Sequence, residues 1–594
     1  MTRKILIRCL LFVLFMGVGY RDQAVWCESL KKSFGAAEQN SVNLYLEVPG
    51  AIKNMYHPKR MPDLYVVYKP YCLVTSQANY NKIQEGDPTA TLADHGSMWN
   101  YDTSVPLIFF GKGIRRGRLE GKANLIDIAP TLASLLGSQP PASSTGRVLR
   151  EAINPFVSRW GSKDVPRVAL VFTLDQCRQD YFTRFADALD YTKKEIIRKG
   201  TVFADTKICY AKTATAVSHT AIGTGTIPGM TGILGNNLYD PDTDEFPLSF
   251  DDSAHGEMSP ENLLVPTLAD VLDQLYHNQS KIVSLSCYGR AAMGLAGHGA
   301  YIGGGDKDIV LALNSFSGLP YTNSDWYTLP DYMKVGYNPD LKIDAWIKKY
   351  YGVDINTEQW TESTTVVDTG PFSLGEKRIP APDGFFPWGE AFSFSHSMID
   401  SQCDYPGDLQ LYQGDEATSK YFEPSNYAPF YQLWAVDQML EIMKQENVGQ
   451  DWVPDMVFFN FKCLDKVGHR FGTSSGEMYT YFYYVDYCLK KIKTWLDANV
   501  GRNEYVMVIT SDHGANDVIA GGEWIIKEDL VALIEKKFGK GIIKKFMGDQ
   551  IFLDKGLLET YGYTDADVGL WMRENLDYLV NVYTKSEIEK VRGQ

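Results

Sequence analysis

Short apolar runs recur along the chain, and four of them have the character of buried β-strands. Each is rich in β-branched or aromatic residues and does not alternate polar with apolar positions, which is typical of a strand covered on both faces. The runs are VALVFTLD from Val168, DMVFFNF from Asp455, YVMVITSDHG from Tyr505 and VPLIFFGKG from Val105. We therefore predict that all four are parallel strands in one sheet.

Segments with helical spacing lie between these runs. FADALDYTKKEIIRKG ends at Gly200, DIAPTLASLLG has Pro130 in its first turn and Gly137 at its end, and TYFYYVDYCLKKIKTWLDANVG repeats apolar residues at helical intervals. An early proline and a late glycine are common helix start and stop signals. Strands that alternate with helices predict an α/β fold, in which helices flank a mostly parallel central sheet.

Two segments break this rhythm. Residues 301–429 are rich in Gly, Pro, Ser, Asp and aromatic residues and lack apolar strand patterns, so we interpret them as a cap inserted over the site. Residues 152–167 contain two prolines, a glycine and mixed charge, which favours a linker. Residues 168–594 follow this linker and hold most of the predicted elements.

The N-terminus begins with the basic stretch MTRKILIR and continues with the apolar run CLLFVLFMGV. This order matches a secretory signal, and the run is shorter than the ~20 residues that a membrane-spanning helix needs. Residues 1–27 are thus expected to be a signal peptide or an N-terminal anchor, with Cys27 as a weak lipoprotein candidate. We expect an exported protein that is periplasmic, at the cell surface or secreted. A hydrophobic first strand is the alternative.

Acidic residues outnumber basic ones and give the chain a net charge of −15. A nucleic-acid polymer is therefore not expected as a partner, since proteins that bind one normally present a basic face. A small phosphorylated substrate stays open, because bound metal ions can dominate the local field.

Three of the predicted strands are followed by acidic residues. Asp175 ends the first run, Asp512 and His513 end the third, and Asp465 follows the second in DKVGH, four positions before His469. Ligand sites in open α/β sheets form beyond the carboxyl ends of the strands. One such Asp is usually a turn or capping residue, but this set of carboxylates and imidazoles suits zinc and similar divalent ions.

The segment AKTATAVSHTAIGTG from Ala211 is dense in hydroxyl groups. A hydroxyl is a poor nucleophile until a metal ion lowers its pKa, and two ions would also hold the oxygens of a transferring phosphoryl group. Spacing alone does not choose among Thr213, Thr215, Ser218 and Thr220. Without the acids, an ordinary Thr/Ser-rich loop would be the preferred interpretation.

In combination, these motifs resemble those of the alkaline phosphatase superfamily. TATAVSHTAIGTGTIPGMTGILGNNLYD resembles the nucleophile segment of the bacterial threonine-nucleophile alkaline phosphatases, which are similar to the type I phosphodiesterase and nucleotide pyrophosphatase group. VFTLDQCRQDY, DKVGHRFG and TSDHG resemble the metal motifs of the same proteins. The resemblance implies an alkaline phosphatase-like core with two Zn²⁺ ions, other divalent metals being the alternative.

The resemblance also implies roles for single residues. It puts Thr215 at the nucleophile position, and Asn236 where a side-chain amide contacts a phosphoryl oxygen. The implied ligands of one zinc are Asp175, Thr215, Asp512 and His513. Asp465 and His469 would hold the other zinc, which needs one more histidine.

A candidate for this histidine lies near the front of the chain. In similar proteins it belongs to an HG motif close to the C-terminus; here DHGSMWNYDTSVPLIFFGKG, with LIDIAPTLASLLG after it, has the family's order but precedes Asp175. MYHPKRMPDLYVV, from Met55, likewise resembles sequence that relatives carry after the point where this chain ends. The chain thus resembles a circular permutation, in which residues 40–151 supply the family's C-terminal part and His95 completes the second zinc site. A gene fusion, or exchange between two chains, is the rival explanation.

One departure from the family's pattern concerns substrate charge. Monoesterase-type relatives carry a Lys-x-Arg pair on the phosphate oxygens, whereas SCYGRAAMGLAGHGA keeps Arg290 and has Tyr288 in the place of the lysine. Losing that cation favours a diester, a nucleotide pyrophosphate or a phosphonate, unless Lys212 or a cap residue restores the charge.

The sequence therefore predicts an exported, zinc-dependent phosphoric-ester hydrolase, an alkaline phosphatase-like monoesterase with a phospho-threonine intermediate. A phosphodiesterase, nucleotide pyrophosphatase or phosphonate hydrolase of the same superfamily is the alternative. A catalytically silent binding protein is an alternative of another class. His298 and His396 are expected to be a structural and a cap residue, and Lys466 is expected to face solvent.

Overall fold

The computed structural model describes residues 44–334 and 429–592, and a few isolated residues between these two ranges. Short gaps interrupt the two ranges, and the longest gaps are 86–89, 314–318 and 517–522. The predicted signal or anchor and most of the predicted cap, with His396, lie outside the described residues. None of the helices within the described part has both the length and the apolar character that crossing a membrane requires.

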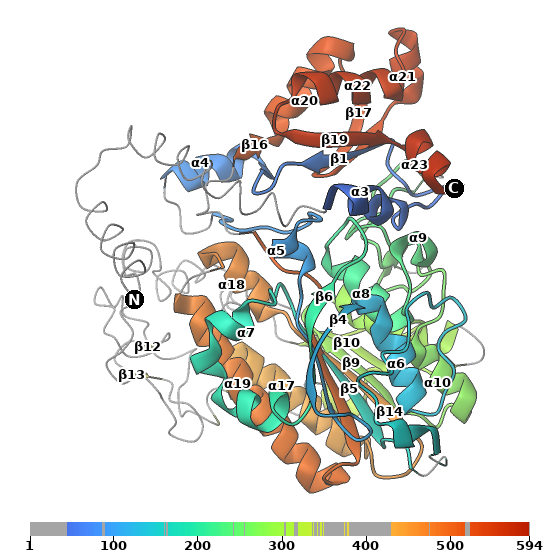
Figure 1. Cartoon of the computed structure of the whole chain (residues 1–594), viewed down its shortest axis with the longest axis vertical. Coiled ribbons are helices and arrows are strands. Elements are labelled where there is room, and N and C mark those ends of the chain that lie inside the picture. The colour runs from blue at the N-terminus through green and yellow to red at the C-terminus, as the bar shows by residue number, and fades with distance from the viewer. Residues whose placement is uncertain are drawn as a thin grey trace.

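A nine-stranded sheet forms the centre of the larger part of the molecule (Figure 1). Five neighbouring strands of this sheet run parallel, from β10 to β15. The strands in order are β11 (Pro320–Tyr321), β10 (Ile309–Leu313), β9 (Ile282–Ser286), β14 (Asp455–Phe461), β5 (Val168–Leu174), β15 (Tyr505–Thr510), β3 (Leu107–Gly111), β6 (Thr201–Lys207) and β4 (Gly117–Asn124). The predicted α/β class with a mostly parallel sheet is confirmed.

Three of the four predicted parallel strands, β14, β5 and β15, lie side by side in register, with Asp455 and Tyr505 both opposite Val168. The fourth, β3, pairs antiparallel with β15 on one side and with β6 on the other. The prediction that β3 is parallel was therefore wrong. A strand covered on both faces is apolar throughout, whichever way it runs, so the hydrophobic pattern carries no information about its direction.

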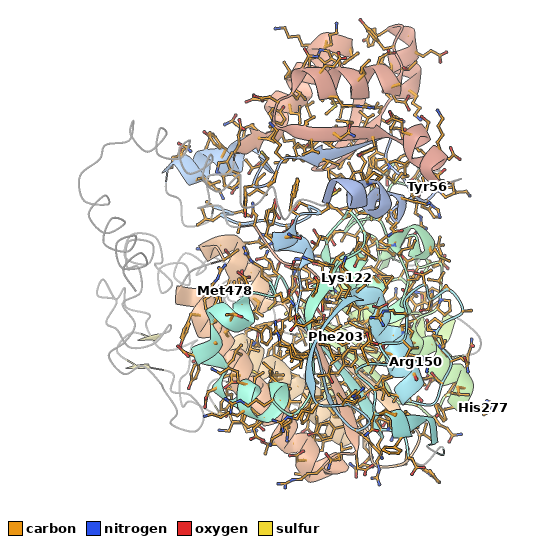
Figure 2. The ribbon with its side chains drawn as sticks, in the orientation of Figure 1. Tyr56, Lys122, Arg150, Phe203, His277 and Met478 are labelled. Atoms are coloured by element: carbon orange, nitrogen blue, oxygen red, sulfur yellow. The ribbon has the colours of Figure 1, made fainter. Side chains whose placement is uncertain are left out.

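Helices cover both faces of this sheet, because alternate residues of its strands point to opposite sides. Leu170 and Phe172 pack into one hydrophobic core, and Ala169 and Val171 into the other. The first core is covered by α17 (Pro429–Gln445), α18 (Cys463–Phe471) and α19 (Gly476–Leu496), and the second by α6 (Ile128–Leu135), α8 (Thr215–Thr224), α10 (Leu268–Tyr276) and α11 (Gly289–Ala296). Figure 2 shows Phe203 of β6 in the interior of this part.

Two of the three predicted helices form as expected, as α6 and α19. The third, over residues 185–200, is helical from Ala186 to Ile197, but its pattern changes from 3₁₀ (Ala186–Leu189) to π-helical (Thr192–Ile197). Where the pattern changes, the carboxylate of Asp486 on α19 accepts hydrogen bonds from the backbone N–H groups of Tyr191 and Thr192, at 2.9 and 2.6 Å. A side chain distant in sequence thus satisfies two backbone donors within this run.

A smaller four-stranded sheet lies beside the larger part (Figure 1). Its strands in order are β17 (Ile543–Met547), β18 (Gln550–Leu553), β1 (Leu64–Tyr68) and β19 (Leu579–Thr584). α20 (Lys527–Phe538), α21 (Lys555–Thr560) and α22 (Asp565–Asn575) pack on it, while α3 (Leu44–Lys53) contacts α23 (Lys585–Arg592). β1, from the front of the chain, is antiparallel to both neighbours from its end. The front section and the C-terminal section therefore form one folded body.

Candidate metal centre

The candidate ligands lie beyond the carboxyl ends of the three central strands. Asp175 follows β5 directly, and Asp512 and His513 follow β15. β14 leads into α18, whose first turn contains Asp465. Because these strands are parallel and in register, the side chains gather at one edge of the sheet.

The first group consists of Asp175, Asp512 and His513, which are fully buried and have donor atoms within 4.8 Å of one another. Nε2 of His513 is 3.2 Å from Oδ2 of Asp512 and 3.7 Å from Oδ1 of Asp175. Nδ1 of His513 donates to the carbonyl oxygen of Gly514 at 3.0 Å, which directs the lone pair of Nε2 at the carboxylates. Neither Nε2 of His513 nor Oδ2 of Asp512 has a hydrogen-bond partner among the described residues. A divalent cation would satisfy both atoms, so these donors fit a metal ion.

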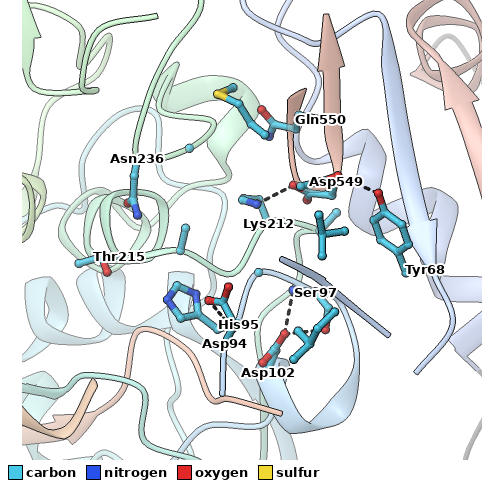
Figure 3. Close-up of a pocket in the computed structure, with 18 of the residues that line it drawn as sticks. Tyr68, Asp94, His95, Ser97, Asp102, Lys212, Thr215, Asn236, Asp549 and Gln550 are labelled. Carbon is cyan, nitrogen blue, oxygen red and sulfur yellow. Dashed lines mark hydrogen bonds and ion pairs between the residues drawn. The ribbon is translucent and has the colours of Figure 1, made fainter. Parts of the chain in front are cut away.

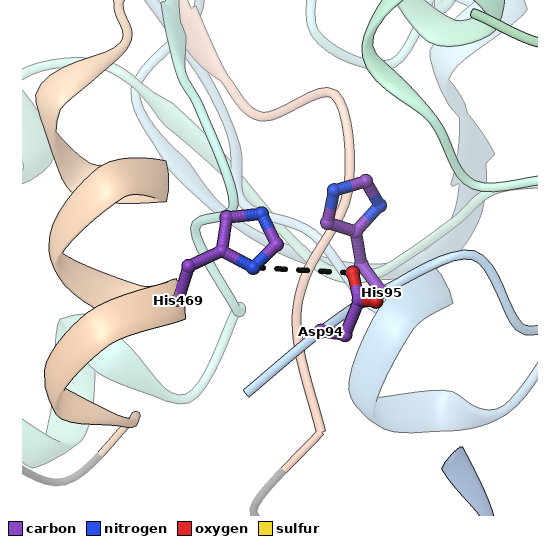
Figure 4. A group of neighbouring side chains, drawn as sticks. All are labelled: Asp94, His95 and His469. Atoms are coloured by element: carbon purple, nitrogen blue, oxygen red, sulfur yellow. Dashed lines mark hydrogen bonds and ion pairs between the residues drawn. The ribbon is translucent and has the colours of Figure 1, made fainter. Parts of the chain in front are cut away.

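The second group is built on α18 and completed by His95. Nε2 of His469 is 3.1 Å from Oδ1 of Asp465, and Nε2 of His95 is 3.7 Å from the same oxygen. Each ring donates through Nδ1 to a backbone carbonyl oxygen, His469 to Ala93 at 2.7 Å and His95 to Thr213 at 2.8 Å. Both Nε2 atoms are thereby turned toward one carboxylate, which is how histidine ligands of a metal ion are commonly held. Figure 4 shows the two rings together with the carboxylate of Asp94, which is 3.9 Å from Nδ1 of His469.

Backbone hydrogen bonds tie the loop that carries His95 to the other motifs. The N–H of Leu92 donates to the carbonyl oxygen of His469 at 2.7 Å, and the N–H of Asp94 donates to Oδ1 of Asn516 at 3.0 Å. The structure therefore brings His95 to the pair that was expected to need a third histidine, and does so within one chain.

The two groups are continuous with each other. The rings of His95 and His513 stack with their centroids 3.6 Å apart. His95 falls within 4.8 Å of Asp465 and His513 in one set, and of Asp94 and His469 in another. The candidate ligands thus form a single row of donors rather than two isolated clusters.

Close packing of these charges shifts their proton affinities in opposite directions. Burial, and then the charge of Asp512, raises the pKa of Asp175 to about 7. Burial lowers the pKa of His513, but the charges of Asp512 and Asp175 outweigh it and raise that pKa to about 9. Burial and the imidazoles of His513 and His469 hold the pKa of His95 well below its usual value. Strongly perturbed groups clustered in this way are typical of a functional site.

The structure separates the four hydroxyl groups that spacing left open. Three of them are hydrogen-bonded within the fold: Thr213 to the carbonyl oxygen of Ser97 at 2.8 Å, Ser218 to the phenol of Tyr210 at 2.9 Å, and Thr220 to the carbonyl oxygen of Ala216 at 2.7 Å. The hydroxyl of Thr215 accepts a hydrogen bond from Nζ of Lys462 at 3.3 Å. Thr215 is the first residue of α8 and, of the four, the one that lines the central cavity. Its hydroxyl lies at a helix N-terminus, where the helix dipole and free N–H groups favour an incoming anion.

Thr215 and the second group, His95, Asp465 and His469, line a cavity of about 590 Å³. Asp175, Asp512 and His513 are not among its lining residues. Both parts of the molecule contribute to its wall: Thr215 and Asn236 come from the larger part, and Asp549 and Gln550 come from the start of β18 in the smaller part (Figure 3). This volume is in the range of small-molecule sites. Access to the metal ligands is therefore shared between the two parts of the molecule.

The other predicted substrate contacts also face this cavity. Oδ1 of Asn236 accepts a hydrogen bond from the N–H of Ala216 at 3.0 Å, which leaves the amide nitrogen for a ligand. Arg290 and Tyr288 line the cavity, with the guanidinium carbon 4.4 Å from the centroid of the Tyr288 ring. Nε of Arg290 is buried and has no acceptor among the described residues. Arg290 is therefore a cation available to an anionic ligand.

The structure also shows the surroundings of three other residues whose roles were predicted from the sequence, Lys212, Lys466 and His298. Lys212, considered as a replacement for the missing cation, is ion-paired with Asp549 at 2.6 Å. Lys466 was predicted to face solvent, and this was wrong, because its side chain is half-buried and lines the cavity. It does so because it lies on α18 between Asp465 and His469, which line the same cavity. Both ring nitrogens of His298 are hydrogen-bonded within the fold, in agreement with a structural residue.

Sequence reasoning missed Lys462, at the start of α18. Its Nζ is 3.0 Å from Oδ1 of Asp175, 2.7 Å from Oδ2 of Asp465 and 3.3 Å from Oγ1 of Thr215. A signal was present in DMVFFNFK, where a lysine ends an otherwise apolar strand.

Two polar residues behind the ligands were also missed. Nδ2 of Asn460 donates to Oδ2 of Asp175 at 2.9 Å, and Nε2 of Gln176 donates to Oδ1 of Asp465 at 3.2 Å. Such hydrogen bonds orient the carboxylates. They depend on the positions of distant elements, so no sequence pattern points to them.

Comparison with known proteins agrees with this geometry. The family model described as type I phosphodiesterase / nucleotide pyrophosphatase matches residues 169–550. The chain is 27% identical to alkaline phosphatase PhoV of Synechococcus elongatus over 443 residues, covering 70% of this chain and 72% of that protein. It is 26% identical to alkaline phosphatase PafA of Elizabethkingia meningoseptica over 452 residues, covering 71% and 74%.

A solved structure supports the fold separately. The crystal structure of wild-type alkaline phosphatase PafA aligns with a TM-score of 0.51 at 23% identity, covering 69% of this chain and 76% of that chain. This likeness confirms the expected alkaline phosphatase-like core.

Proposed function

Because the chain belongs to the type I phosphodiesterase / nucleotide pyrophosphatase family, we propose that it hydrolyses small phosphate esters through a covalent phosphate ester of Thr215. Family and relatives identify it as a phosphoric-ester hydrolase of the alkaline phosphatase and phosphodiesterase type. The alkaline phosphatase relatives favour a phosphate monoester as the substrate.

The position of Thr215 carries the proposal. Of the four candidate hydroxyls it is the one that lines the cavity, and it begins α8. Its Oγ1 shares Lys462 with Asp175 of the first donor group and Asp465 of the second. A nucleophile is expected where the groups that activate it and those that hold its target meet.

The proposed reaction has two displacements at phosphorus. Oγ1 of Thr215 forms a bond to phosphorus as the bond to the ester oxygen breaks, and the leaving alcohol takes that electron pair and a proton. Water then attacks the phospho-threonine, which releases phosphate and restores the hydroxyl. The amide of Asn236 and the guanidinium of Arg290 hold non-bridging oxygens during both steps.

Two divalent metal ions are part of the proposal. One would be held by Asp175, Thr215, Asp512 and His513, and the other by Asp465, His469 and His95. Mixed carboxylate and imidazole donors suit Zn²⁺, and the unpaired Nε2 of His513 and Oδ2 of Asp512 support a cation between them. When bound, such ions lower the pKa of a hydroxyl nucleophile and neutralise charge that develops in the transition state.

A second candidate is hydrolysis of diesters, including nucleotide pyrophosphates, or of phosphonates. The observation that favours it is Tyr288 on the cavity wall, where the resemblance expects a lysine. A tyrosine donates one neutral hydrogen bond and would give less preference for a doubly charged monoester.

The domain organisation and the export of the protein are also proposed. We propose that residues 40–151 are the permuted C-terminal part of the catalytic domain and that 152–167 rejoin the old termini. The pairing of β1 with β18 and β19 supports this proposal. A chain that begins at residue 168 and carries 40–151 after its end should then fold and remain active. Export rests on the basic and apolar N-terminal sequence, and secretion of a reporter fused to residues 1–27 would test it.

One experiment tests the proposed chemistry. Zinc-loaded protein is mixed with p-nitrophenyl phosphate or bis-p-nitrophenyl phosphate, quenched in acid and analysed by peptide mass spectrometry. We expect turnover, and phosphate on the peptide that contains Thr215, which Thr215→Ala abolishes. Phosphate on another residue would contradict the assignment. A protein that binds two metal ions but turns over neither ester would instead be a binding protein.

A further inference from the structure

The ammonium group of Lys462 lies among the proposed metal ligands, and the proposed reaction leaves it without a role. Its side chain is only 3% exposed. Burying a lysine is unfavourable unless opposite charges compensate, and here Asp175 and Asp465 lie at 3.0 and 2.7 Å. The two carboxylates therefore stabilise a buried ammonium at a place where the surrounding donors otherwise suit metal cations.

The hydrogen-bond geometry of Lys462 points toward the nucleophile. An ammonium has three donor hydrogens and no acceptor. Two of them are directed at the carboxylates of Asp175 and Asp465, and the third lies toward Oγ1 of Thr215 at 3.3 Å. A phosphoryl group that bonds to Oγ1 of Thr215 would bring its own oxygens within reach of this third donor hydrogen, which could turn to them from Oγ1.

The surroundings of Tyr288 show where this cation lies relative to the cavity. Nζ of Lys462 is 5.5 Å from the centroid of the Tyr288 ring, and the guanidinium carbon of Arg290 is 4.4 Å from it. Lys462 comes from the end of β14, whereas Tyr288 and Arg290 come from the start of α11. The ammonium of Lys466 on α18 lies 5.3 Å from the same centroid, so two ammonium groups and a guanidinium surround this ring. Lys462 is singled out because it also donates to Oγ1 of Thr215.

We propose that Lys462, together with Arg290, binds the terminal oxygens of a phosphate monoester beside Thr215, and so replaces the cation that Tyr288 does not supply. This inference rests on the proposed function and narrows its substrate class. A monoester dianion offers two charged oxygens to two cations, whereas a diester carries one charge. The site therefore selects monoesters even with a tyrosine at position 288.

Substrate preference and metal content together test the assignment. The variants are Lys462→Met, Tyr288→Lys, the double variant, and Lys493→Met. Lys493 is the matched control, because it is also a buried lysine, paired with Asp497 at 2.8 Å, but on α19 away from the cavity. The measurements are bound zinc, kcat/KM for p-nitrophenyl phosphate and for bis-p-nitrophenyl phosphate, and calorimetric binding of inorganic phosphate.

Lys462→Met should keep its metal ions but lose about 10- to 100-fold in monoester kcat/KM and in phosphate affinity, the effect of removing one charge-assisted contact. Diester kcat/KM should fall much less, so that the ratio of monoester to diester activity drops about 10-fold. The double variant should regain monoester preference, and Lys493→Met should behave as wild type. Equal losses for both esters, or loss of metal, would overturn the proposal.

If Lys462→Met does not fold, the ratio of monoester to diester activity in Tyr288→Lys tests the same proposal. If Lys462 already provides the cation, Tyr288→Lys alone should change the ratio of monoester to diester activity by less than about 3-fold. An increase of about 10-fold or more would mean that the site lacks this cation. If the wild type hydrolyses neither ester, the proposed function fails. Phosphate binding that is weakened by Lys462→Met would then still support the cation site, and unchanged binding would refute it.

Discussion

Two regions of this molecule bury carboxylates close together, and they differ in their place on the sheet and in the groups that face the carboxylates. In the candidate metal centre, Asp175, Asp465 and Asp512 lie at the carboxyl ends of the central strands. In the second region, Asp273 on α10 and Asp308 directly before β10 lie at the amino ends of the parallel strands, with the exposed Asp306. The oxygens of this second trio are also within 4.8 Å of one another.

The difference lies in what faces the acids. In the metal centre, imidazole Nε2 atoms and the ammonium of Lys462 face the carboxylates, and the same ammonium donates to the hydroxyl of Thr215. In the second region, no hydrogen-bond donor among the described residues faces either oxygen of Asp273 or Oδ2 of Asp308. Clustered acids alone therefore do not define a site of phosphoryl transfer. Positioned bases, cations and a nucleophile define it.

Removal of a buried acid from the metal centre should have the largest effect. Asp512→Ala deletes a proposed ligand and removes the carboxylate that lies 3.2 Å from Nε2 of His513. We expect loss of one metal ion and a fall in kcat/KM of about 10⁴-fold, comparable with the loss of a central catalytic group. Metal analysis and p-nitrophenyl phosphate kinetics measure both. Asp451→Ala, at the surface, is the control. If Asp512→Ala kept both metal ions and near-normal turnover, the acids of the metal centre would be no more important for activity than those of the second region.

Removal of the imidazole from the front section should have the next largest effect. His95→Ala removes one of two Nε2 atoms that face Oδ1 of Asp465. We expect weaker binding of one metal ion only, and a loss of about 10²- to 10³-fold in kcat/KM that excess zinc partly restores. His277→Asn is the control, because it is exposed and asparagine tolerates its left-handed backbone conformation. Unchanged zinc affinity in His95→Ala would remove the front section from the metal centre.

The sequence predicts some parts of this site and not others, for physical reasons. Asp175, Asp512 and His513 were predictable because the carboxyl ends of parallel strands meet at one edge of a sheet. His95 was found only through the resemblance, since no local rule connects it to Asp465. Lys462 was missed because two of its partners, Asp175 and Thr215, come from elements distant in sequence, and only Asp465 is near it along the chain. The direction of β3 was mispredicted because burial on both faces removes the periodicity that would report it.

Neutralising an acid of the second region should stabilise the protein, whereas removing a residue of the metal centre should impair it. Burial, and then the charge of Asp306, raises the pKa of Asp273 to about 8. The folded protein therefore binds more protons than the unfolded chain between about pH 4 and pH 8, and its stability falls as the pH rises through this range. Asp273→Asn should be more stable than wild type by roughly 1 to 3 kcal/mol at pH 9 and nearly equal to it at pH 5, with unchanged activity.

Denaturant unfolding of the zinc-saturated protein at the two pH values measures this difference. Asp331→Asn is the control, because its side chain is 85% exposed and should give no pH-dependent gain. Lower stability of Asp273→Asn at pH 9 would mean that a cation or donor satisfies this cluster. The two regions would then be alike.

The smallest effect should come from the exposed acid beside the metal centre. Oδ1 of Asp94 accepts a hydrogen bond from the N–H of His95 at 2.8 Å and is 3.9 Å from Nδ1 of His469, but its side chain is 43% exposed. Asp94→Asn keeps the acceptor for His95 and removes only a charge that solvent already screens. Zinc affinity, measured by competition with a chromophoric chelator, should weaken by no more than about 3-fold, and less at high salt than at low salt. A 100-fold loss, or one that salt does not reduce, would show that an exposed carboxylate here acts as a ligand. The contrast between the two regions would then depend on ligand number rather than on burial and orientation.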